Sequence, residues 1–234
     1  MFLKKTVLAI SIIMLTFVSA LWAGDAAVFV DLGFSSDGRT YMFGQYGVLS
    51  PSLRPWAEIY VVDVAGNNFV QNGRASQTDS SAIRAGQDGS GTFHRLLSNN
   101  SNIVSRYGIN FQNQGLPLYI SRVEDPPERG EKRDFRDFIA GKEYIAELIP
   151  SISGSGNSTR SSFYINLEVR SSGGGQAQNY TIGNPGIVRQ KIASYNIKKV
   201  LIDANGGSVI FVIEMKRVAE NGYDIRYMVE ALRL

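Results

Sequence analysis

One histidine and a few carboxylates are the residues whose chemistry could support catalysis. His94 is the only histidine in the chain. A Ser-His-Asp arrangement needs only one histidine, but no Gly-x-Ser-x-Gly nucleophile motif accompanies it. Asp31, Asp37, Glu58 and Asp63 lie close enough in sequence for a pair of them to hydrolyse a sugar. Both sets are more typical of strand ends and solvated surfaces, so we predict no catalytic residue.

The composition excludes several classes of cofactor and metal site. A chain without cysteine cannot use a thiol nucleophile, an iron–sulfur cluster or a thiolate zinc site, and a single histidine excludes multi-histidine sites. Residues 86–91 resemble a glycine-rich phosphate loop but lack the Lys-Ser/Thr pair that follows such loops. Residues 203–207 have only part of the spacing of a calcium loop. We therefore predict neither a cofactor nor a metal ion.

A group of aromatic residues near the start of the chain is the best candidate for a ligand or partner surface. Aromatic side chains give a large contact area at low conformational cost, so they could line a groove. The alternative is that they pack between sheets. The group consists of Tyr41, Phe43, Tyr46, Trp56 and Tyr60.

The elements that position these residues are predicted to be antiparallel strands. Residues 28–34 and 41–43 are rich in β-branched and aromatic residues and flank an Asp-Gly turn, and residues 57–64 give a third strand. Residues 201–211 repeat the layout of the first hairpin, and residues 223–230 repeat that of the third strand. Both ends are therefore blade-like meanders. A propeller needs at least four such blades, so one or two antiparallel sheets are favoured over it.

The sequence in the middle of the chain, around residues 71–142, indicates a helical and polar insertion. Apolar residues between 93 and 107 recur at spacings of three, four and seven, which indicates one amphipathic helix or two short ones. Residues 122–137 carry many charges of both signs and predict a solvated loop that leads into a short helix. The fold class is therefore mostly β (α+β), with antiparallel meanders, blade-like at both ends, and a short helical insertion.

The first 23 residues have the order of a secretory signal peptide. Lys4 and Lys5 precede an uncharged apolar run, which ends in small residues at Ala20 and Ala23. Cleavage after either alanine fits, and an uncleaved membrane anchor is the alternative. We predict a signal peptide at 1–23 and a single β-rich secreted domain at 24–234. The protein would be periplasmic and would meet the membrane only through the leader during export.

Charge gives little support for a nucleic-acid partner. The whole chain has a net charge of +3, and the leader carries two lysines and no acid. Its removal brings the secreted domain close to neutrality, whereas nucleic-acid binding domains carry clustered positive charge.

Two early segments resemble a family of bacterial predicted secreted proteins that is catalogued as a domain of unknown function. They are FVDLGFSSDGRTYMFGQYGV at 29–48 and AEIYVVDV at 57–64, and the later GIVRQKIASYNIKKVLID at 186–203 is compatible with the same family. The resemblance implies export in Gram-negative bacteria and supplies no activity, cofactor or catalytic residue. The chain departs from the family pattern after Val48, where Leu49-Ser50-Pro51 replaces a glycine-rich phrase.

Two hypotheses about function follow from the sequence. The first is an exported periplasmic protein that is non-catalytic and binds another envelope component, either an envelope protein or a glycan, or supports envelope structure. The second is a periplasmic hydrolase that uses carboxylates or a Ser/His94 pair. The hydrolase requires Asp31, Asp37 or His94 to converge in a concave pocket.

Overall fold

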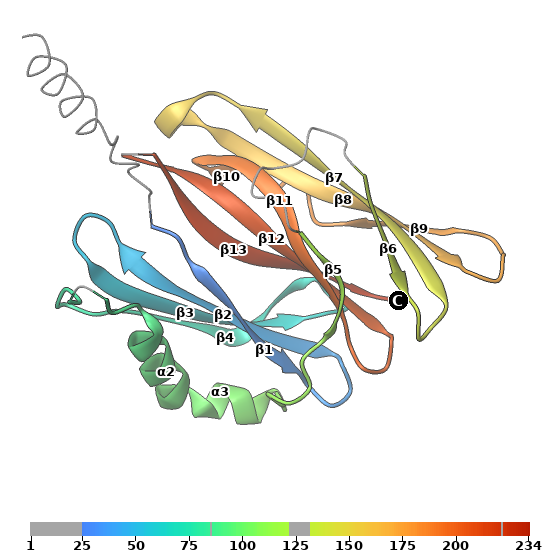
Figure 1. Ribbon diagram of the computed structural model, residues 1–234, viewed down its shortest axis with the longest axis horizontal. Coiled ribbons are helices and arrows are strands. Elements are labelled where there is room, and N and C mark those ends of the chain that lie inside the picture. Colours follow the sequence, from blue (N-terminus) through green and yellow to red (C-terminus); the bar gives the residue numbers. More distant parts are fainter. Residues whose placement is uncertain (1–24, 85, 122–131, 221) are drawn as a thin grey trace, which may run out of the picture.

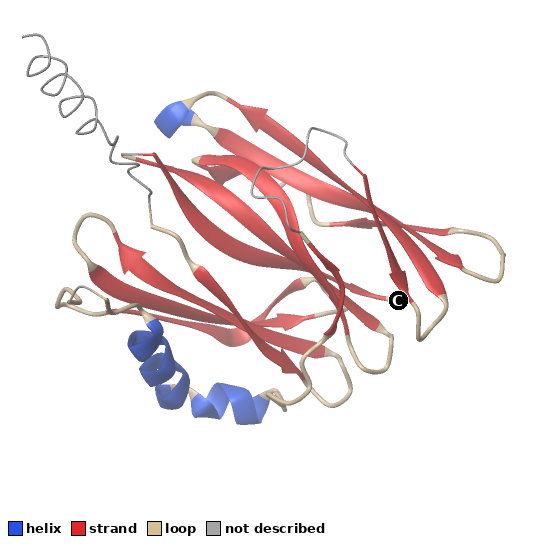
Figure 2. Cartoon of the chain, in the orientation of Figure 1, coloured by secondary structure: helices blue, strands red, loops and turns tan. Residues whose placement is uncertain are grey.

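The computed structural model describes residues 25–84, 86–121, 132–220 and 222–234, and strands dominate it (Figure 2). The predicted signal peptide lies outside the described residues. The first sheet is an antiparallel meander in the order β1-β2-β3-β4. Its strands are β1 (Val28–Phe34), β2 (Thr40–Leu49), β3 (Arg54–Asp63) and β4 (Asn68–Thr78).

Two further sheets follow along the chain. The second sheet has the order β10-β8-β7-β6, with β9 also paired to β8, and the central sheet has the order β13-β12-β11-β5. The second sheet contains β6 (Lys132–Asp137), β7 (Lys142–Ser153), β8 (Arg160–Ser171), β9 (Gln178–Ile182) and β10 (Arg189–Gln190). The central sheet contains β5 (Leu116–Ile120), β11 (Ile192–Ile202), β12 (Ser208–Ala219) and β13 (Gly222–Arg233). The helical elements are α2 (Ser90–Asn99), α3 (Ser101–Arg106) and the 3-10 turn η1 (Gly156–Ser158).

The three sheets stack in layers because the central sheet is apolar on both faces (Figure 1). Phe211 and Ile213 of β12 pack against the second sheet, whereas Ile210 and Val212 pack against the first sheet. All four side chains are buried. A strand that is covered on both faces has a continuous apolar sequence instead of an alternating one, and this explains the run at 209–213.

The two short helices cover the outer face of the first sheet. Phe93 and Leu96 of α2, with Ile103 of α3, join Met42 and Ile59 of the sheet in one buried cluster. Their spacing of three and seven places these helical residues on one apolar face. The predicted helical pair is therefore confirmed, and its role is to shield the first sheet from solvent.

The repeated layout at the two ends places two turns against each other. Ser208, after the β11–β12 turn, donates a hydrogen bond from Oγ to the carbonyl oxygen of Gly38 at 2.7 Å. Asp203 Oδ1 accepts from the backbone N–H groups of Gly207 and Ser208, both at 2.7 Å. Gly38 has a φ of +67°, and a Cβ there would lie 2.4 Å from Asp203 Oδ2, so only glycine fits. The hydrogen bonds of Asp203 therefore order the β11–β12 turn, and the turn at Gly38 packs against it.

Three expectations from the sequence differ from the structure. Residues 132–137 form the strand β6 in place of a short helix. Phe135 and Asp137 are buried, and the exposed side chains of Lys132, Asp134 and Arg136 alternate with them, as in a strand. The rest of that charged stretch, 122–131, lies outside the described residues. The polar residues from 68 to 78 form the edge strand β4, most of whose side chains face solvent. Finally, the described residues form three sheets, stacked in layers, where one or two were expected, and they do not form a propeller.

The described residues contain no helix with the length and apolar character needed to cross a membrane.

Removing the ring of Phe211 tests the layered core. Phe211 is fully buried, so Phe211→Ala should lower the free energy of unfolding by about 3–5 kcal/mol, measured by urea denaturation of the exported protein. Phe111→Ala is the matched control, because that ring is 44 % exposed, and it should cost about 1 kcal/mol or less. Equal losses in the two variants would contradict the placement of β12 between two sheets.

Candidate functional site

The structure places most of the predicted aromatic surface inside the protein. Tyr41, Phe43 and Trp56 are buried. Tyr60 stacks on Phe43 with ring centroids 5.0 Å apart, on the face of the first sheet that meets the central sheet. Tyr46 packs against a ring of α2 on the opposite face. The structure thus brings Tyr41, Phe43 and Tyr60 together in one core cluster. A role of the five residues in binding a partner stays a prediction.

The residues required by the hydrolase hypothesis are not brought together. Asp31 pairs with Phe43 across the β1–β2 ladder, which puts it on the inner face of the first sheet. His94 is exposed on α2, which covers the outer face of that sheet. Asp37 lies in the exposed β1–β2 turn, where it accepts a hydrogen bond from Ser35 Oγ at 2.7 Å. Burial raises the pKa of Asp31, and hydrogen bonds from Tyr41 and from the Gly33 backbone partly oppose this.

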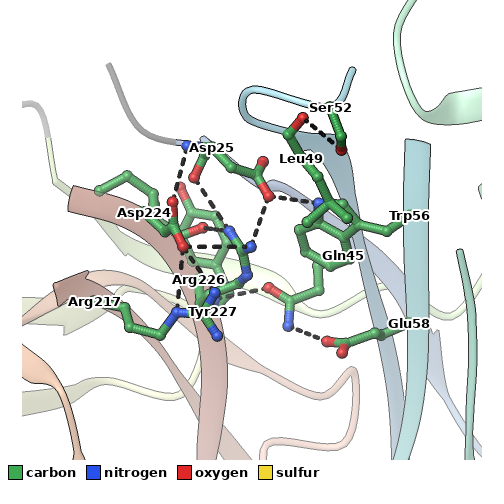
Figure 3. Close-up of polar contacts among 11 residues, drawn as sticks. Asp25, Gln45, Leu49, Ser52, Trp56, Glu58, Arg217, Asp224, Arg226 and Tyr227 are labelled. Atoms are coloured by element: carbon green, nitrogen blue, oxygen red, sulfur yellow. Dashed lines mark hydrogen bonds and ion pairs between the residues drawn. The ribbon is translucent and has the colours of Figure 1, made fainter. Parts of the chain in front are cut away.

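A buried ionic network ties the first described residues to β13 (Figure 3). The side chain of Asp25 is 2 % exposed, and its Oδ2 accepts hydrogen bonds from Trp56 Nε1 and Arg226 Nη2, both at 2.6 Å. The guanidinium of Arg226 also lies 4.2 Å from the ring centre of Trp56. Backbone bonds between Asp25, Ala27 and Ile225 continue the contact. Burial raises the pKa of Asp25, against the lowering effect of Arg226.

The same network continues onto the first sheet. Gln45 Oε1 accepts from the backbone N–H of Tyr227 at 2.8 Å, and Gln45 Nε2 donates to Glu58 Oε2 at 2.9 Å. Arg217 pairs with Asp224 at 2.7 Å. Because these charged groups are bonded to one another, the network joins the first sheet to the edge of the central sheet and is structural.

The Asp25 network can be tested by removing its central carboxylate. Asp25→Ala leaves Arg226, whose side chain is 11 % exposed, without its main counter-charge, and should destabilise the fold by roughly 3–5 kcal/mol. Arg39→Ala breaks an exposed ion pair with Asp37, so chemical denaturation should show no measurable change for that variant. If both variants unfold like the wild type, Asp25 is not an anchor.

A groove of about 490 Å³ opens where the three sheets meet, within the size range of small-molecule sites. Its walls come from the β3–β4 turn of the first sheet, the segment between β9 and β10 of the second sheet, and the second half of β13. We call it the Glu230 groove. The lining residues are Val62, Ala65, Gly66, Asn67, Asn68, Phe69, Thr181, Ile182, Gly183, Asn184, Ile187, Arg189, Met228, Val229, Glu230, Ala231 and Leu232.

A buried carboxylate lies in this groove. Glu230 Oε2 accepts a hydrogen bond from Asn67 Nδ2 at 2.6 Å, and Oε1 lies 3.7 Å from Arg189 Nη2. The Glu230 side chain is 7 % exposed. Burial raises the pKa of Glu230 above its ordinary value, while Asn67 and Arg189 act in the opposite direction. Burial of a charged group beside a basic residue is characteristic of functional sites as well as of structural pairs.

Two backbone features hold the groove open. Asn67 adopts a φ of +46°, which asparagine tolerates better than most residues, and its Oδ1 accepts from the backbone N–H of Ala231 at 2.7 Å. This bond fixes the β3–β4 turn against β13. Gly183 has a φ of +90°, and a Cβ there would come within 3.5 Å of both carboxylate oxygens of Glu230. The missing side chain therefore leaves space next to the carboxylate.

Apolar side chains flank the polar floor of the groove. Phe69 is 41 % exposed and Ile187 is 52 % exposed. Arg189 is held by the ring of Phe163, whose centre lies 5.0 Å from the guanidinium carbon. The site therefore offers hydrogen-bond acceptors, amide and guanidinium donors, and an exposed ring within one groove.

A larger and more open hollow lies beside the start of α2, where residues 86–91 were expected to form a flexible loop. It is lined mostly by small and polar residues, and its charged residues are Asp79, Asp88 and Arg95. The Asp79 carboxylate is already bound by Thr92, Arg95 and Gln77, and these bonds and the nearby cation keep its pKa below the ordinary range. Its charge is satisfied by the protein, so this hollow is a weaker candidate. Within the described residues, no cluster of three or more acidic or histidine side chains could hold a metal ion.

Sequence reasoning did not find the Glu230 groove. Asn67 and Glu230 are 163 residues apart, and each has an ordinary local explanation, as a turn residue and as a strand residue. The one available signal was an acidic residue between Val229 and Ala231, in an otherwise apolar part of the last strand.

The pH dependence of stability tests the burial of Glu230. Because the folded-state pKa lies above the unfolded value near 4.5, the folded protein holds more protons between those two values, and stability falls as the pH rises through that window. Glu230→Gln lacks this loss. Urea denaturation should therefore show the variant gaining stability relative to the wild type as the pH rises above about 4.5. Parallel pH profiles for the two proteins would contradict an elevated pKa.

The family comparison covers the site. The family model described as "Predicted secreted protein (DUF2259)" matches residues 42–233. That range includes every lining residue of the Glu230 groove. No curated protein and no solved structure matches the chain. The matched range takes in most of the chain, as the resemblance at its early segments implied, and the chain belongs to this family of predicted secreted proteins, a domain family of unknown function.

Proposed function

We propose that the protein is a non-catalytic periplasmic binding protein that holds an envelope glycan in the Glu230 groove. The observation that carries the proposal is a buried carboxylate, bonded to Asn67 and beside Arg189, in a groove with polar and apolar walls. The family is described as one of predicted secreted proteins. The predicted leader is consistent with the periplasm as the protein's destination.

The side chains of the groove match the hydrogen-bonding pattern of a sugar. A carboxylate accepts bonds from hydroxyl groups, while the amides of Asn68 and Asn184 and the guanidinium of Arg189 can donate to them. Hydrogen bonds to a charged partner are the stronger ones, which gives Glu230 the largest share of the polar recognition. Phe69 offers an exposed ring for the carbon face of a sugar.

Charge favours a neutral ligand over a polyanion. The lining contains one acidic side chain, Glu230, and one basic side chain, Arg189. Nucleic acids are bound through many lysine and arginine contacts to phosphates, and this groove does not supply them. A neutral polyhydroxyl chain needs no such compensation.

The geometry supports binding without hydrolysis. Glycosidases generally use two carboxyl groups on either side of the scissile bond. Among the described residues that line the groove, Glu230 is the one carboxylate. We infer that the groove retains its ligand unchanged.

Titration with defined glycans tests the proposal. The probes are neutral oligosaccharides added to isotopically labelled exported protein: oligomers of N-acetylglucosamine, which carry the hydroxyl and N-acetyl groups of the peptidoglycan backbone, and uncharged repeating units of lipopolysaccharide side chains. Binding should shift the backbone amide resonances of residues 66–69, 181–184 and 228–232. Glu230→Gln should weaken binding by about 10- to 100-fold, because charge-assisted hydrogen bonds contribute roughly 1.5–3 kcal/mol.

The matched control is Glu220→Gln, which changes an exposed carboxylate in the β12–β13 turn that does not line this groove. It should bind the probes like the wild type. No shift with either class of glycan, or equal weakening by both substitutions, would sink the proposal.

A further inference from the structure

The β6–β7 hairpin ends in two large apolar side chains that have no cover. Phe138 is 87 % exposed and Ile139 is 85 % exposed, and the other large apolar side chains exposed in the described residues reach at most 57 %. Single exposed apolar residues are common on protein surfaces, but adjacent ones at a protruding tip mark a contact surface. We call residues 138–141 the hairpin tip.

An ordered turn holds these two side chains outward. Asp137 is buried, and its Oδ1 accepts from the backbone N–H groups of Ile139 at 2.8 Å and Ala140 at 2.9 Å. Gly141 closes the turn with a φ of +61°. The exposure of Phe138 and Ile139 is therefore built into the turn by a buried carboxylate.

The neighbouring loop extends an uncharged surface around the tip. Ser172 donates a backbone hydrogen bond to the carbonyl oxygen of Gly141 at 2.8 Å, which places the β8–β9 loop beside the tip. Residues 138–141 and 172–177 contain no charged side chain. Charged residues begin immediately behind this surface.

Charged side chains of both signs fill the rows of the sheet behind the tip. Arg136, Glu143 and Arg170 lie in one cross-strand row, and Lys142 pairs with Asp137 in the row next to the tip. The two arginine side chains are 60 % and 53 % exposed, and each forms an ion pair, Arg136 with Glu143 and Arg170 with Glu168. An apolar tip backed by paired charges of both signs matches the layering of a phospholipid surface, where acyl chains lie beneath charged headgroups.

We propose that the hairpin tip inserts Phe138 and Ile139 into the surface of a phospholipid membrane, with the ion pairs of Arg136 and Arg170 at the level of the headgroups. A lipid surface is favoured over a protein partner because of size. A stable protein interface buries about 800 Å² on each side, which a convex tip with two apolar side chains does not provide, whereas lipid needs no matching surface. The inference is independent of the Glu230 groove and adds a membrane contact to the one predicted for the leader.

A tryptophan introduced at the hairpin tip tests insertion directly. Trp56 is buried, and the substitution Trp22→Phe removes the other native tryptophan, so the exported form of a Phe138→Trp/Trp22→Phe variant reports on the tip. With vesicles of phosphatidylethanolamine and phosphatidylglycerol, its emission should shift to the blue and be quenched by brominated acyl chains. Absence of quenching while the protein floats with the vesicles would overturn the proposal.

Paired substitutions distinguish vesicle binding through the hairpin tip from nonspecific binding and from binding through the leader. The double variant Phe138→Ser/Ile139→Ser should bind the vesicles at least about tenfold more weakly than the wild type, given the apolar area that it removes. Ile120→Ser is the control, because Ile120 is 57 % exposed on β5, and it should bind normally. Urea denaturation should be unchanged in both. Equal binding by all three proteins, or burial of the introduced tryptophan by an envelope protein without lipid, would refute insertion.

Discussion

The requirement to cover both faces of β12 determines the architecture. The run from Val209 to Ile213 is almost entirely removed from solvent, with alternate side chains directed to opposite sheets. Burial of these side chains contributes about 1.5–3 kcal/mol each, so neither covering sheet can be omitted without exposing a large apolar surface. The first sheet then has an outer face of its own, which the two short helices cover. The sequence of layers follows from this one strand.

The exposed edge of the central sheet creates the setting for the groove. β13 is paired with β12 on one side only, and the unpaired backbone groups of an edge strand need other partners. Asp25 supplies a backbone acceptor to Ile225, Gln45 supplies a side-chain acceptor to Tyr227, and Asn67 supplies one to Ala231. The first sheet thus closes this edge with amide side chains. The side chain of Asn67 also donates to Glu230, so the same residue contacts the edge strand and lines the groove.

Local patterns allowed much of the fold to be predicted from the sequence. The apolar run of β12, the repeated strand–turn–strand layout at the two ends and the helical spacing between 93 and 107 all correspond to observed elements. The strands β4 and β6 were missed because their polar side chains face solvent, and their strand structure comes from pairing with neighbours. The groove could not be predicted, since its walls come from three sheets and its key contact joins residues 67 and 230. The hairpin tip could not be predicted, because Phe138 and Ile139 follow a dense run of charged residues that is typical of a solvated loop.

The packing of the first sheet against the central sheet has a consequence for how the chain matures. Phe29, Tyr41, Phe43 and Tyr60 present an aromatic inner face whose cover is β11, β12 and β13, which come much later in the sequence. Because chains are synthesised from the amino end onward, this apolar face stays uncovered until those three strands have been made. Contacts between such distant segments also close slowly. The incomplete chain, whose aromatic face is still exposed, is therefore the form that a holding chaperone would have to bind.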